Sequence, residues 1–205
     1  MAFRLGRQLT ATGLNTADDG IEFSYRRQFL GPRRSTRLLR RIWLETEWQQ
    51  QKISLFGRRL AQPRLSCWQG DPGICYSYSG LKLQAIGWHP ELSRLRRELQ
   101  QELGTGFNSV LLNAYRNERD SMGWHSDDEK ELGEFPLIAS ISLGATRRFL
   151  WRPKSGNRTF ELPLEHGSLL VMQGKSQSAY QHSLPKVTRP VGLRINLTFR
   201  NILSE

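Results

Sequence analysis

Hydrophobic and polar positions alternate in short runs along the half of the chain that follows Gly106. In one run, Ser140 and Ser142 alternate with Ile141 and Leu143, the period of two expected of a strand with one polar and one apolar face. Three further runs have this strand-like texture and are separated by turns, namely 107–115, 159–174 and 192–202. Many short strands without crossover helices favour a β-sandwich or jelly roll over a parallel α/β sheet.

The part of the chain before Gly106 mixes helical and strand-like patterns. The leucines of Pro90–Leu103 recur at every third or fourth position between an opening proline and Gly104, which predicts a helix. A second helix is predicted over Ser35–Trp48, with Ser35 as its cap. The sequence ISLFGRRL, residues 53–60, predicts a β-hairpin with Gly57 near its tip.

The length of 205 residues suits a single domain with a short extension. Residues 1–20 are polar with little periodicity, and we expect them to be mobile. Residues 21–205 are expected to form one α+β, mainly β domain. Its helices and hairpin lie in about 21–104 and its jelly-roll core in about 105–205. No pattern indicates an oligomer, so a monomer is expected.

Cysteine usage and hydropathy restrict the cellular setting. The two cysteines, Cys67 and Cys75, do not form a CxxC pair, which favours free thiols in a reducing compartment. The chain has no apolar run of 18 residues and no apolar secretory segment at its start. We therefore expect no membrane span and no secretion. The location would be the cytoplasm in a bacterium or the nucleus in a eukaryote.

Positive charge is concentrated near the N-terminus. The net charge is +11, and residues 1–64 hold 13 Lys and Arg against 5 Asp and Glu. Seven arginines crowd into one short stretch: Arg26, Arg27, Arg33, Arg34, Arg37, Arg40 and Arg41. Guanidinium groups match phosphate oxygens, so the cluster can be a nucleic-acid footprint. A solvated charged face or a targeting tail is the equally weighted alternative.

In the last strand-like run, residues 192–202, one of the two strand faces is polar, and in a β-sandwich one of these faces would point into the interior. Arg194, Asn196, Thr198 and Arg200 alternate with the apolar residues Ile195, Leu197 and Phe199. A buried guanidinium without a partner is costly. If the polar face lies inside a jelly roll, these side chains must bind something there.

The stretch WHSDDE, residues 124–129, places His125 and Asp127 two residues apart. On an extended segment both side chains project to one face and can bind one ion. A downstream His182 would complete a 2-His-1-carboxylate triad, which leaves three open positions on Fe(II). His-X-Asp also occurs by chance, and a surface or capping histidine is the alternative for His125.

Three motifs together carry a family resemblance: NAYRNERDSMGWHSDDE, YQHSLP and RINLTFR. In this order and spacing they resemble the AlkB family of Fe(II)/2-oxoglutarate-dependent dioxygenases, over roughly residues 52–202. The resemblance implies a double-stranded β-helix core with N-terminal helices and a hairpin and substrate lid. It also implies Fe(II) as cofactor, with 2-oxoglutarate and O2 as co-substrates.

The resemblance assigns site residues one by one. His125, Asp127 and His182 would ligate Fe(II). Asn113 and Tyr115 would hydrogen-bond 2-oxoglutarate, and Arg194 would pair with its C5 carboxylate. Asn196 and Arg200 would lie near its C1 end. Glu129 would pair with Arg200 or sense the substrate base, with Asp128 as the alternative for that role.

The resemblance also points to the substrate. The hairpin is similar to one that carries an apolar wedge in the duplex-DNA-acting subgroup, and its implied DNA contacts are Leu55, Phe56, Gly57, Arg58 and Arg59. QGDPGICYSYSG resembles the substrate lid, where Tyr76 and Tyr78 would stack on a flipped base. Trp124 would lie beside the metal strand. For Phe56 the alternative is an ordinary core residue, and for the tyrosines an ordinary half-buried strand.

The implied activity is oxidative dealkylation of bases such as 1-methyladenine and 3-methylcytosine in DNA repair, with release of formaldehyde, succinate and CO2. The expected partner is alkylated DNA, double-stranded before single-stranded DNA or RNA. Such lesions are cationic, so neighbouring carboxylates would favour them. Two other functions remain: a hydroxylase of a protein or small molecule, and a non-catalytic nucleic-acid-binding module.

Overall fold

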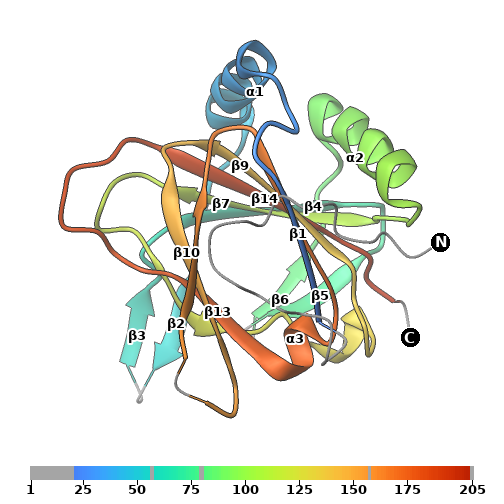
Figure 1. Cartoon of the computed structure of the whole chain (residues 1–205). Coiled ribbons are helices and arrows are strands. Elements are labelled where there is room, and N and C mark those ends of the chain that lie inside the picture. Colours follow the sequence, from blue (N-terminus) through green and yellow to red (C-terminus); the bar gives the residue numbers. More distant parts are fainter. Residues whose placement is uncertain (1–20, 56–57, 79–80, 157, 204–205) are drawn as a thin grey trace.

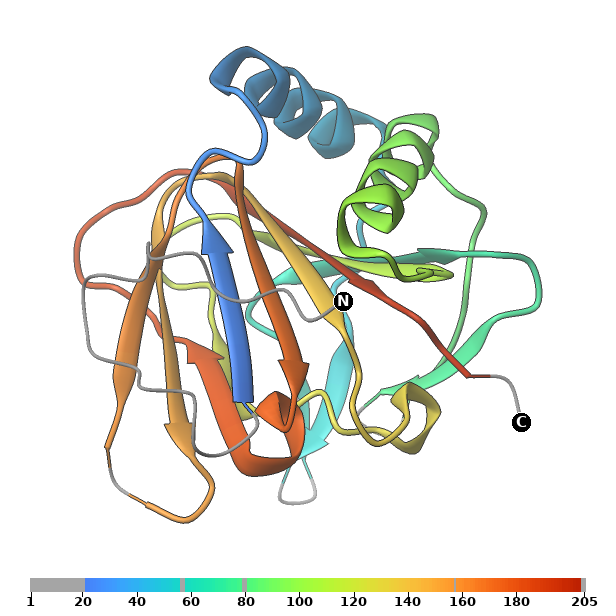
Figure 2. The same cartoon turned by 45° about the vertical axis from the view of Figure 1, so that its right-hand side comes forward.

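The computed structural model describes residues 21–55, 58–78, 81–156 and 158–203, and within these ranges the chain folds into two main antiparallel sheets. The larger sheet has the strand order β1-β12-β9-β14-β7-β4. Its strands are β1 (Ile21–Arg26), β4 (Leu65–Gly70), β7 (Ser109–Tyr115), β9 (Ile138–Gly144), β12 (Ser168–Gly174) and β14 (Arg194–Arg200). Figure 2 shows β1 running beside β12 at one edge of this sheet.

The smaller sheet has the order β11-β10-β13-β8 and faces the larger one (Figure 1). It consists of β8 (Met122–His125), β10 (Arg147–Pro153), β11 (Phe160–Leu164) and β13 (Tyr180–Leu184). This arrangement of two antiparallel sheets confirms the predicted jelly roll. Because β1 and β4 belong to the larger sheet, residues before and after 104 share one sheet.

Two hairpins complete the strands: β2 (Lys52–Leu55) with β3 (Arg58–Ala61), and β5 (Cys75–Tyr78) with β6 (Leu81–Gln84). The first confirms the predicted hairpin, since Leu55 pairs with Arg58. Its tip, Phe56 and Gly57, lies outside the described residues.

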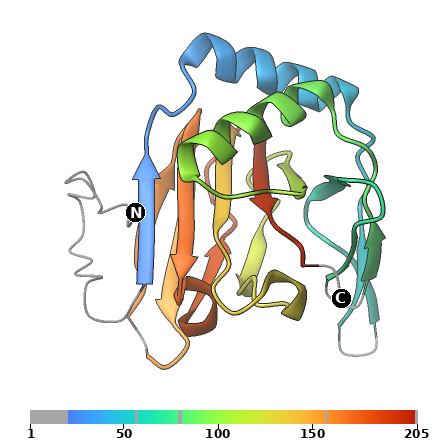
Figure 3. The ribbon, with the colours of Figure 1, turned by 90° about the vertical axis from the view of Figure 1, so that its right-hand side faces the viewer.

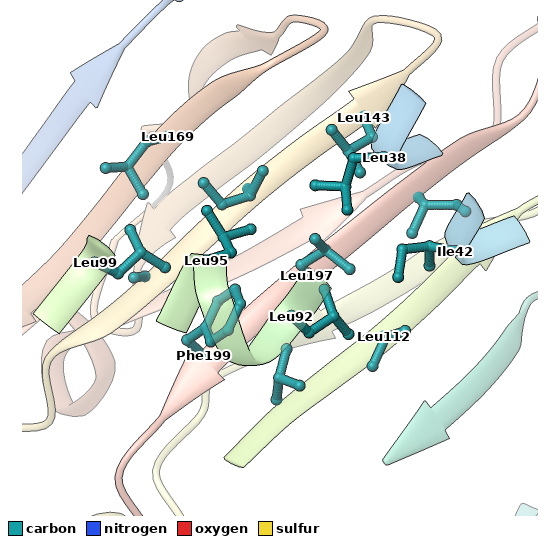
Figure 4. Close-up of a cluster of buried hydrophobic side chains, with 14 of the residues drawn as sticks. Leu38, Ile42, Leu92, Leu95, Leu99, Leu112, Leu143, Leu169, Leu197 and Phe199 are labelled. Atoms are coloured by element: carbon teal, nitrogen blue, oxygen red, sulfur yellow. The ribbon is translucent and has the colours of Figure 1, made fainter. Parts of the chain in front are cut away.

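Two helices, α1 (Pro32–Glu45) and α2 (Pro90–Leu103), lie side by side on one face of the larger sheet, as Figure 3 shows. The apolar residues of alternate sheet positions point toward them, so that Leu112 and Leu197 pack with Leu38 and Leu95 (Figure 4). Residues of the opposite register, such as Asn113 and Asn196, line a pocket on the other face. The period of two therefore separates the helix-covered core from the polar interior.

The prediction for α2 is confirmed at both ends. The helix begins at Pro90 with His89 as its cap, since the His89 Nδ1 accepts a hydrogen bond from the Glu91 N–H. It ends before Gly104, which adopts a left-handed conformation with φ of 65°. Pro90 and Gly104, which mark the two ends of the helix, are the residues on which the prediction rested.

The prediction for α1 was wrong in its boundaries. The helix begins at Pro32 and ends at Glu45, so Ser35 lies inside its first turn and does not cap it. Proline suits the first helical turn because it has no N–H to leave unpaired there. The buried Ser35 hydroxyl donates instead to the carbonyls of Leu30 and Gly31.

Two short helical turns complete the fold: η1 (Lys130–Leu132), and α3 (Ser176–Ala179) between β12 and β13. Within the residues that the structure describes, no helix has the length and apolar character needed to cross a membrane. Residues 1–20, which we expected to be mobile, lie outside the described residues.

Candidate functional site: a His-Asp-His cluster and a buried arginine

A polar pocket opens between the two sheets. Its polar lining comes from β7, β9 and β14 of the larger sheet, from β8 and β13 of the smaller one, and from Asp127 just after β8. The pocket brings together residues from all three of the separate motifs, among them Asn113, Asp127, His182, Arg194, Asn196 and Arg200. Sequence positions that are far apart therefore meet in one place.

Three side chains are arranged so that they could hold one metal ion. His125 ends β8, and its cross-strand partner in β13 is His182. One ligand atom from each of His125, Asp127 and His182 lies within 4.8 Å of the other two. The distance from the His125 Nε2 to the Asp127 Oδ1 is 3.9 Å.

Asp127 is buried, with 2 % of its surface exposed, and its two carboxylate oxygens differ in their surroundings. The Arg200 Nη2 donates to the Oδ2 at 2.7 Å, whereas the Oδ1 has no hydrogen-bond partner among the described residues. Burial opposes ionisation, but the charge of Arg200 is the strongest effect against it, and the pKa of Asp127 is lowered. An ionised buried carboxylate with one unpartnered oxygen suits a metal ligand.

The two histidines are neutral and therefore suited to metal binding. Burial, together with the neighbouring His125, lowers the pKa of His182 to about 3. Burial also lowers the pKa of His125, against the opposing effect of Asp127. The His125 Nδ1 lies 2.9 Å from the Gly123 carbonyl. If this nitrogen carries the proton, the Nε2 has a free lone pair on the side of Asp127.

Arg194 is fully buried at the start of β14 and lines the same pocket. Its Nη2 donates to the Ser142 Oγ and the Asn196 Oδ1, both at 2.9 Å. Its Nε and Nη1 have no hydrogen-bond partner in the described part of the chain. Burial lowers the pKa of Arg194 to about 10, while Tyr115 acts in the opposite direction. A buried guanidinium with donors left over suits an anionic partner, so the residues fit a carboxylate of 2-oxoglutarate.

The remaining polar residues predicted for 2-oxoglutarate lie around this arginine. The Tyr115 ring centroid is 5.2 Å from the Arg194 Cζ. The Asn196 Nδ2 donates to the hydroxyls of Ser140 and Thr198. Asn196 is therefore held in one orientation by its neighbours on the polar face of the sheet.

Arg64 is a buried residue that sequence reasoning missed. It precedes β4, and its Nε donates to the Asn113 Oδ1 at 3.0 Å. Its position after Pro63 gives no sign of burial, since a single arginine in a polar stretch usually lies in solvent. The ion pair between Arg200 and Asp127 was also missed, because we placed Arg200 near 2-oxoglutarate and gave Glu129 as the acid that pairs with it.

The residues predicted to meet the substrate are less completely placed. Trp124 is 37 % exposed, and the Arg152 Cζ lies 4.2 Å from its ring centroid. Asp128 is exposed and pairs with the Lys154 Nζ at 2.8 Å, whereas Glu129 is half-buried at the start of η1. Arg59 is exposed on β3.

For the other residues predicted to contact DNA or the substrate base, the structure describes no side chain. Phe56 and Gly57 are outside the described residues. Leu55, Arg58, Tyr76 and Tyr78 are placed by their backbone alone, on the two hairpins. The apolar wedge and the tyrosine lid therefore stay predictions.

The seven N-terminal arginines divide into two sets. Four form ion pairs, namely Arg26 with Glu102, Arg27 with Glu165, Arg34 with Glu98, and Arg41 with Glu45 and Glu91. Arg33, Arg37 and Arg40 are exposed, and no described carboxylate lies within ion-pair distance of them. All three lie on α1, which covers the face of the larger sheet opposite the pocket.

Comparison with known proteins gives a consistent picture. Residues 22–200 match the model of the 2OG-Fe(II) oxygenase superfamily, which extends the similarity well before residue 52. The alkB homolog 3 dioxygenases of Bos taurus and Homo sapiens are 44 % and 39 % identical over 70 % and 82 % of this chain. The chain spans only 53 % and 62 % of the lengths of those two proteins.

A DNA oxidative demethylase ALKBH2 of Mus musculus is 42 % identical over 74 % of this chain and 67 % of its own length. A solved structure, "The structure of OsALKBH1", superposes with a TM-score of 0.63. It is 19 % identical and covers 87 % of this chain and 97 % of its own, so it supports the fold alone. On the strength of the matched model and these relatives, the chain belongs to the AlkB family within the 2OG-Fe(II) oxygenase superfamily.

Proposed function

We propose that the protein is an Fe(II)- and 2-oxoglutarate-dependent oxidative demethylase of alkylated bases in nucleic acid. The observation that carries the proposal is the fully buried Arg194, whose two unpartnered nitrogens share a pocket with His125, Asp127 and His182. A buried guanidinium with unsatisfied donors is costly unless an anion completes it. Together these groups would receive a metal ion and a dicarboxylate side by side.

Each side chain in the pocket has a distinct part in this function. His125, Asp127 and His182 would hold Fe(II), and Arg200 would keep Asp127 ionised and turned toward the metal. Arg194 would bind the far carboxylate of 2-oxoglutarate, with Ser142 and Asn196 fixing its fork. When bound, the metal and 2-oxoglutarate supply the oxidising chemistry, and the chain supplies orientation and electrostatics.

Alkylated DNA is the proposed substrate, on the basis of relatives named DNA oxidative demethylase. Removal of a methyl group by hydroxylation would release formaldehyde and restore the base. Glu129, half-buried after the metal motif, would favour a cationic lesion, and Asp128 would do so from solvent. Tyr76 and Tyr78 would stack on the flipped base.

Duplex DNA is the favoured form of the substrate, bound by a monomer. The β2–β3 hairpin supports this preference, since an apolar tip at Leu55, Phe56 and Gly57 could fill the gap that a flipped base leaves. Arg58 and Arg59 would hold the flanking phosphates. Replacing Phe56 with alanine should lower turnover on duplex more than on single strands, whereas equal losses would remove the wedge.

Formaldehyde release tests the central proposal. The protein with Fe(II), ascorbate and 2-oxoglutarate should release formaldehyde from an oligonucleotide that contains 1-methyladenine, and an unmethylated oligonucleotide serves as the blank. His125→Ala and Asp127→Ala should each abolish the release. Normal turnover in either variant would exclude the metal assignment. Turnover of 2-oxoglutarate that no alkylated nucleic acid stimulates would instead favour a protein or small-molecule substrate.

A further inference from the structure

Asp127 lies beyond the part of the sheet that positions the two histidines. Strand β8 ends at His125, and its last pairing with β13 is the one between His125 and His182. Asp127 follows two residues later, outside any strand. Its backbone therefore has no neighbouring strand to hold it, although its carboxylate must lie within a few tenths of an ångström of a fixed place to ligate a metal.

The side chain of Gln177 takes the place of that missing strand. The Gln177 Oε1 accepts a hydrogen bond from the Asp127 backbone N–H at 2.9 Å. Its Nε2 donates to the Met172 Sδ at 3.6 Å and to the Ser176 Oγ at 3.2 Å. Gln177 is 1 % exposed, so both ends of its amide are used in a buried setting.

The same segment supports both sides of the metal cluster. Gln177 lies on α3, which leads directly into β13 and so to His182. Next to Asp127, the Ser126 Oγ donates to the Tyr180 carbonyl at 2.7 Å. Two hydrogen bonds thus join the segment with His125 and Asp127 to the segment that precedes His182.

We propose that Gln177 is a positioning residue for the metal cluster, an inference that rests on the proposed iron site. Gln177 holds the backbone of Asp127, and Arg200 holds its Oδ2, so the Oδ1 is directed toward the histidines. Without Gln177 the buried Asp127 N–H loses its partner, and the loop can turn the carboxylate away. Groups that orient a ligand in this way typically change metal affinity about 10- to 100-fold when they are replaced.

Three variants test the inference. Gln177→Met keeps the length of the side chain but removes the acceptor, and Gln177→Glu keeps an acceptor. Ser178→Ala is the matched control, because Ser178 lies exposed on the same turn and its Oγ contacts only the Lys175 carbonyl, at 3.4 Å. We would measure Mn(II) affinity by calorimetry, the melting temperature of the metal-free protein, and the anaerobic absorption band with Fe(II) and 2-oxoglutarate.

Gln177→Met should weaken Mn(II) binding about 10- to 100-fold and diminish the absorption band. Gln177→Glu should recover most of the affinity, and Ser178→Ala should match the parent protein. If Gln177→Met does not fold, Gln177→Asn carries the same prediction, since its shorter side chain withdraws the acceptor. A lower melting temperature with Mn(II) affinity within twofold of the parent would overturn the inference and leave Gln177 a structural residue.

Asp127→Ala separates this result from a failure of the iron site itself. Loss of Mn(II) binding in Asp127→Ala, with unchanged binding in Gln177→Met, would overturn only the role of Gln177. Unchanged Mn(II) binding in Asp127→Ala would overturn the metal site, and the role of Gln177 with it.

Discussion

Two groups of arginines in this protein have the same side chain and opposite surroundings. Those of the pocket, Arg194 and Arg200, have 0 % and 3 % of their surface exposed and sit between two sheets. Those of the first helix, Arg33, Arg37 and Arg40, lie in solvent on the far side of the larger sheet. The pocket arginines contact hydroxyl, amide and carboxylate groups that are buried or half-buried, whereas the side chains of the helix arginines are exposed.

The difference shows that burial decides what an arginine does more than the number of arginines in a stretch of sequence does. A guanidinium that has lost its water must find partners, so Arg194 and Arg200 are restricted to one geometry. An exposed guanidinium has no such need, and its ion pairs are weak and screened by salt. The N-terminal arginine cluster is therefore easier to notice in the sequence than Arg194 and Arg200, but its side chains are less constrained by the structure.

The largest effect is expected from replacing the pocket arginine. Arg194→Met should raise the dissociation constant for 2-oxoglutarate by about 30-fold or more, the usual loss for one partner of a buried charge pair. The metal-free variant should be as stable as the parent or more stable, because it no longer buries two unpartnered donors. Calorimetry with 2-oxoglutarate and thermal unfolding measure the two effects, with Arg37→Met as the surface control. Unchanged 2-oxoglutarate affinity would contradict the proposed binding mode.

A smaller effect is expected from the exposed arginines of α1, and it decides between the two interpretations of the N-terminal cluster. If they contact phosphates, replacing Arg33, Arg37 and Arg40 together with alanine should lower the slope of log affinity against log salt for long DNA by up to about three. Turnover of a short methylated oligonucleotide should not change, because α1 lies opposite the pocket.

The control removes the same charge from paired positions, as the triple variant Arg26→Ala, Arg27→Ala and Arg34→Ala. An equal fall in slope for both triple variants would indicate only the effect of overall charge. No fall in either would show that the arginines of α1 are a solvated face.

The smallest effect concerns the ion pairs of the first helix. The pKa of Glu45 is lowered to about 2 from the usual 4.5. The largest cause is a hydrogen bond from Arg41, and the second largest is a hydrogen bond from His89. A lowered pKa in the folded state means that the stabilisation is present above about pH 4.5 and is lost as the pH falls toward 2. An NMR titration of the Glu45 carboxyl should give a midpoint below 4.5 that rises toward it in Arg41→Ala or in high salt. A midpoint unaffected by removing Arg41 would show that the pair contributes nothing.

Local patterns predicted some elements well. The leucine spacing predicted α2, and Pro90 and Gly104 predicted its two ends. These predictions succeeded because proline and glycine act on the backbone where they stand. The alternation from Arg194 to Arg200 correctly indicated a strand with one polar face. For α1 we took Ser35 as the start, whereas the helix begins at Pro32.

What the sequence determined by itself was the set of chemical groups: a histidine and an aspartate two residues apart, a later histidine, and two arginines on the same face of a strand. These follow from local periodicity, which a strand converts directly into a shared face. The tertiary structure alone decided which groups touch. Gln177 reaches Asp127 across 50 residues, Arg200 reaches it across 73, and Arg64 reaches Asn113 across 49. Such contacts depend on how the two sheets pack against each other, and no spacing along the chain encodes that packing.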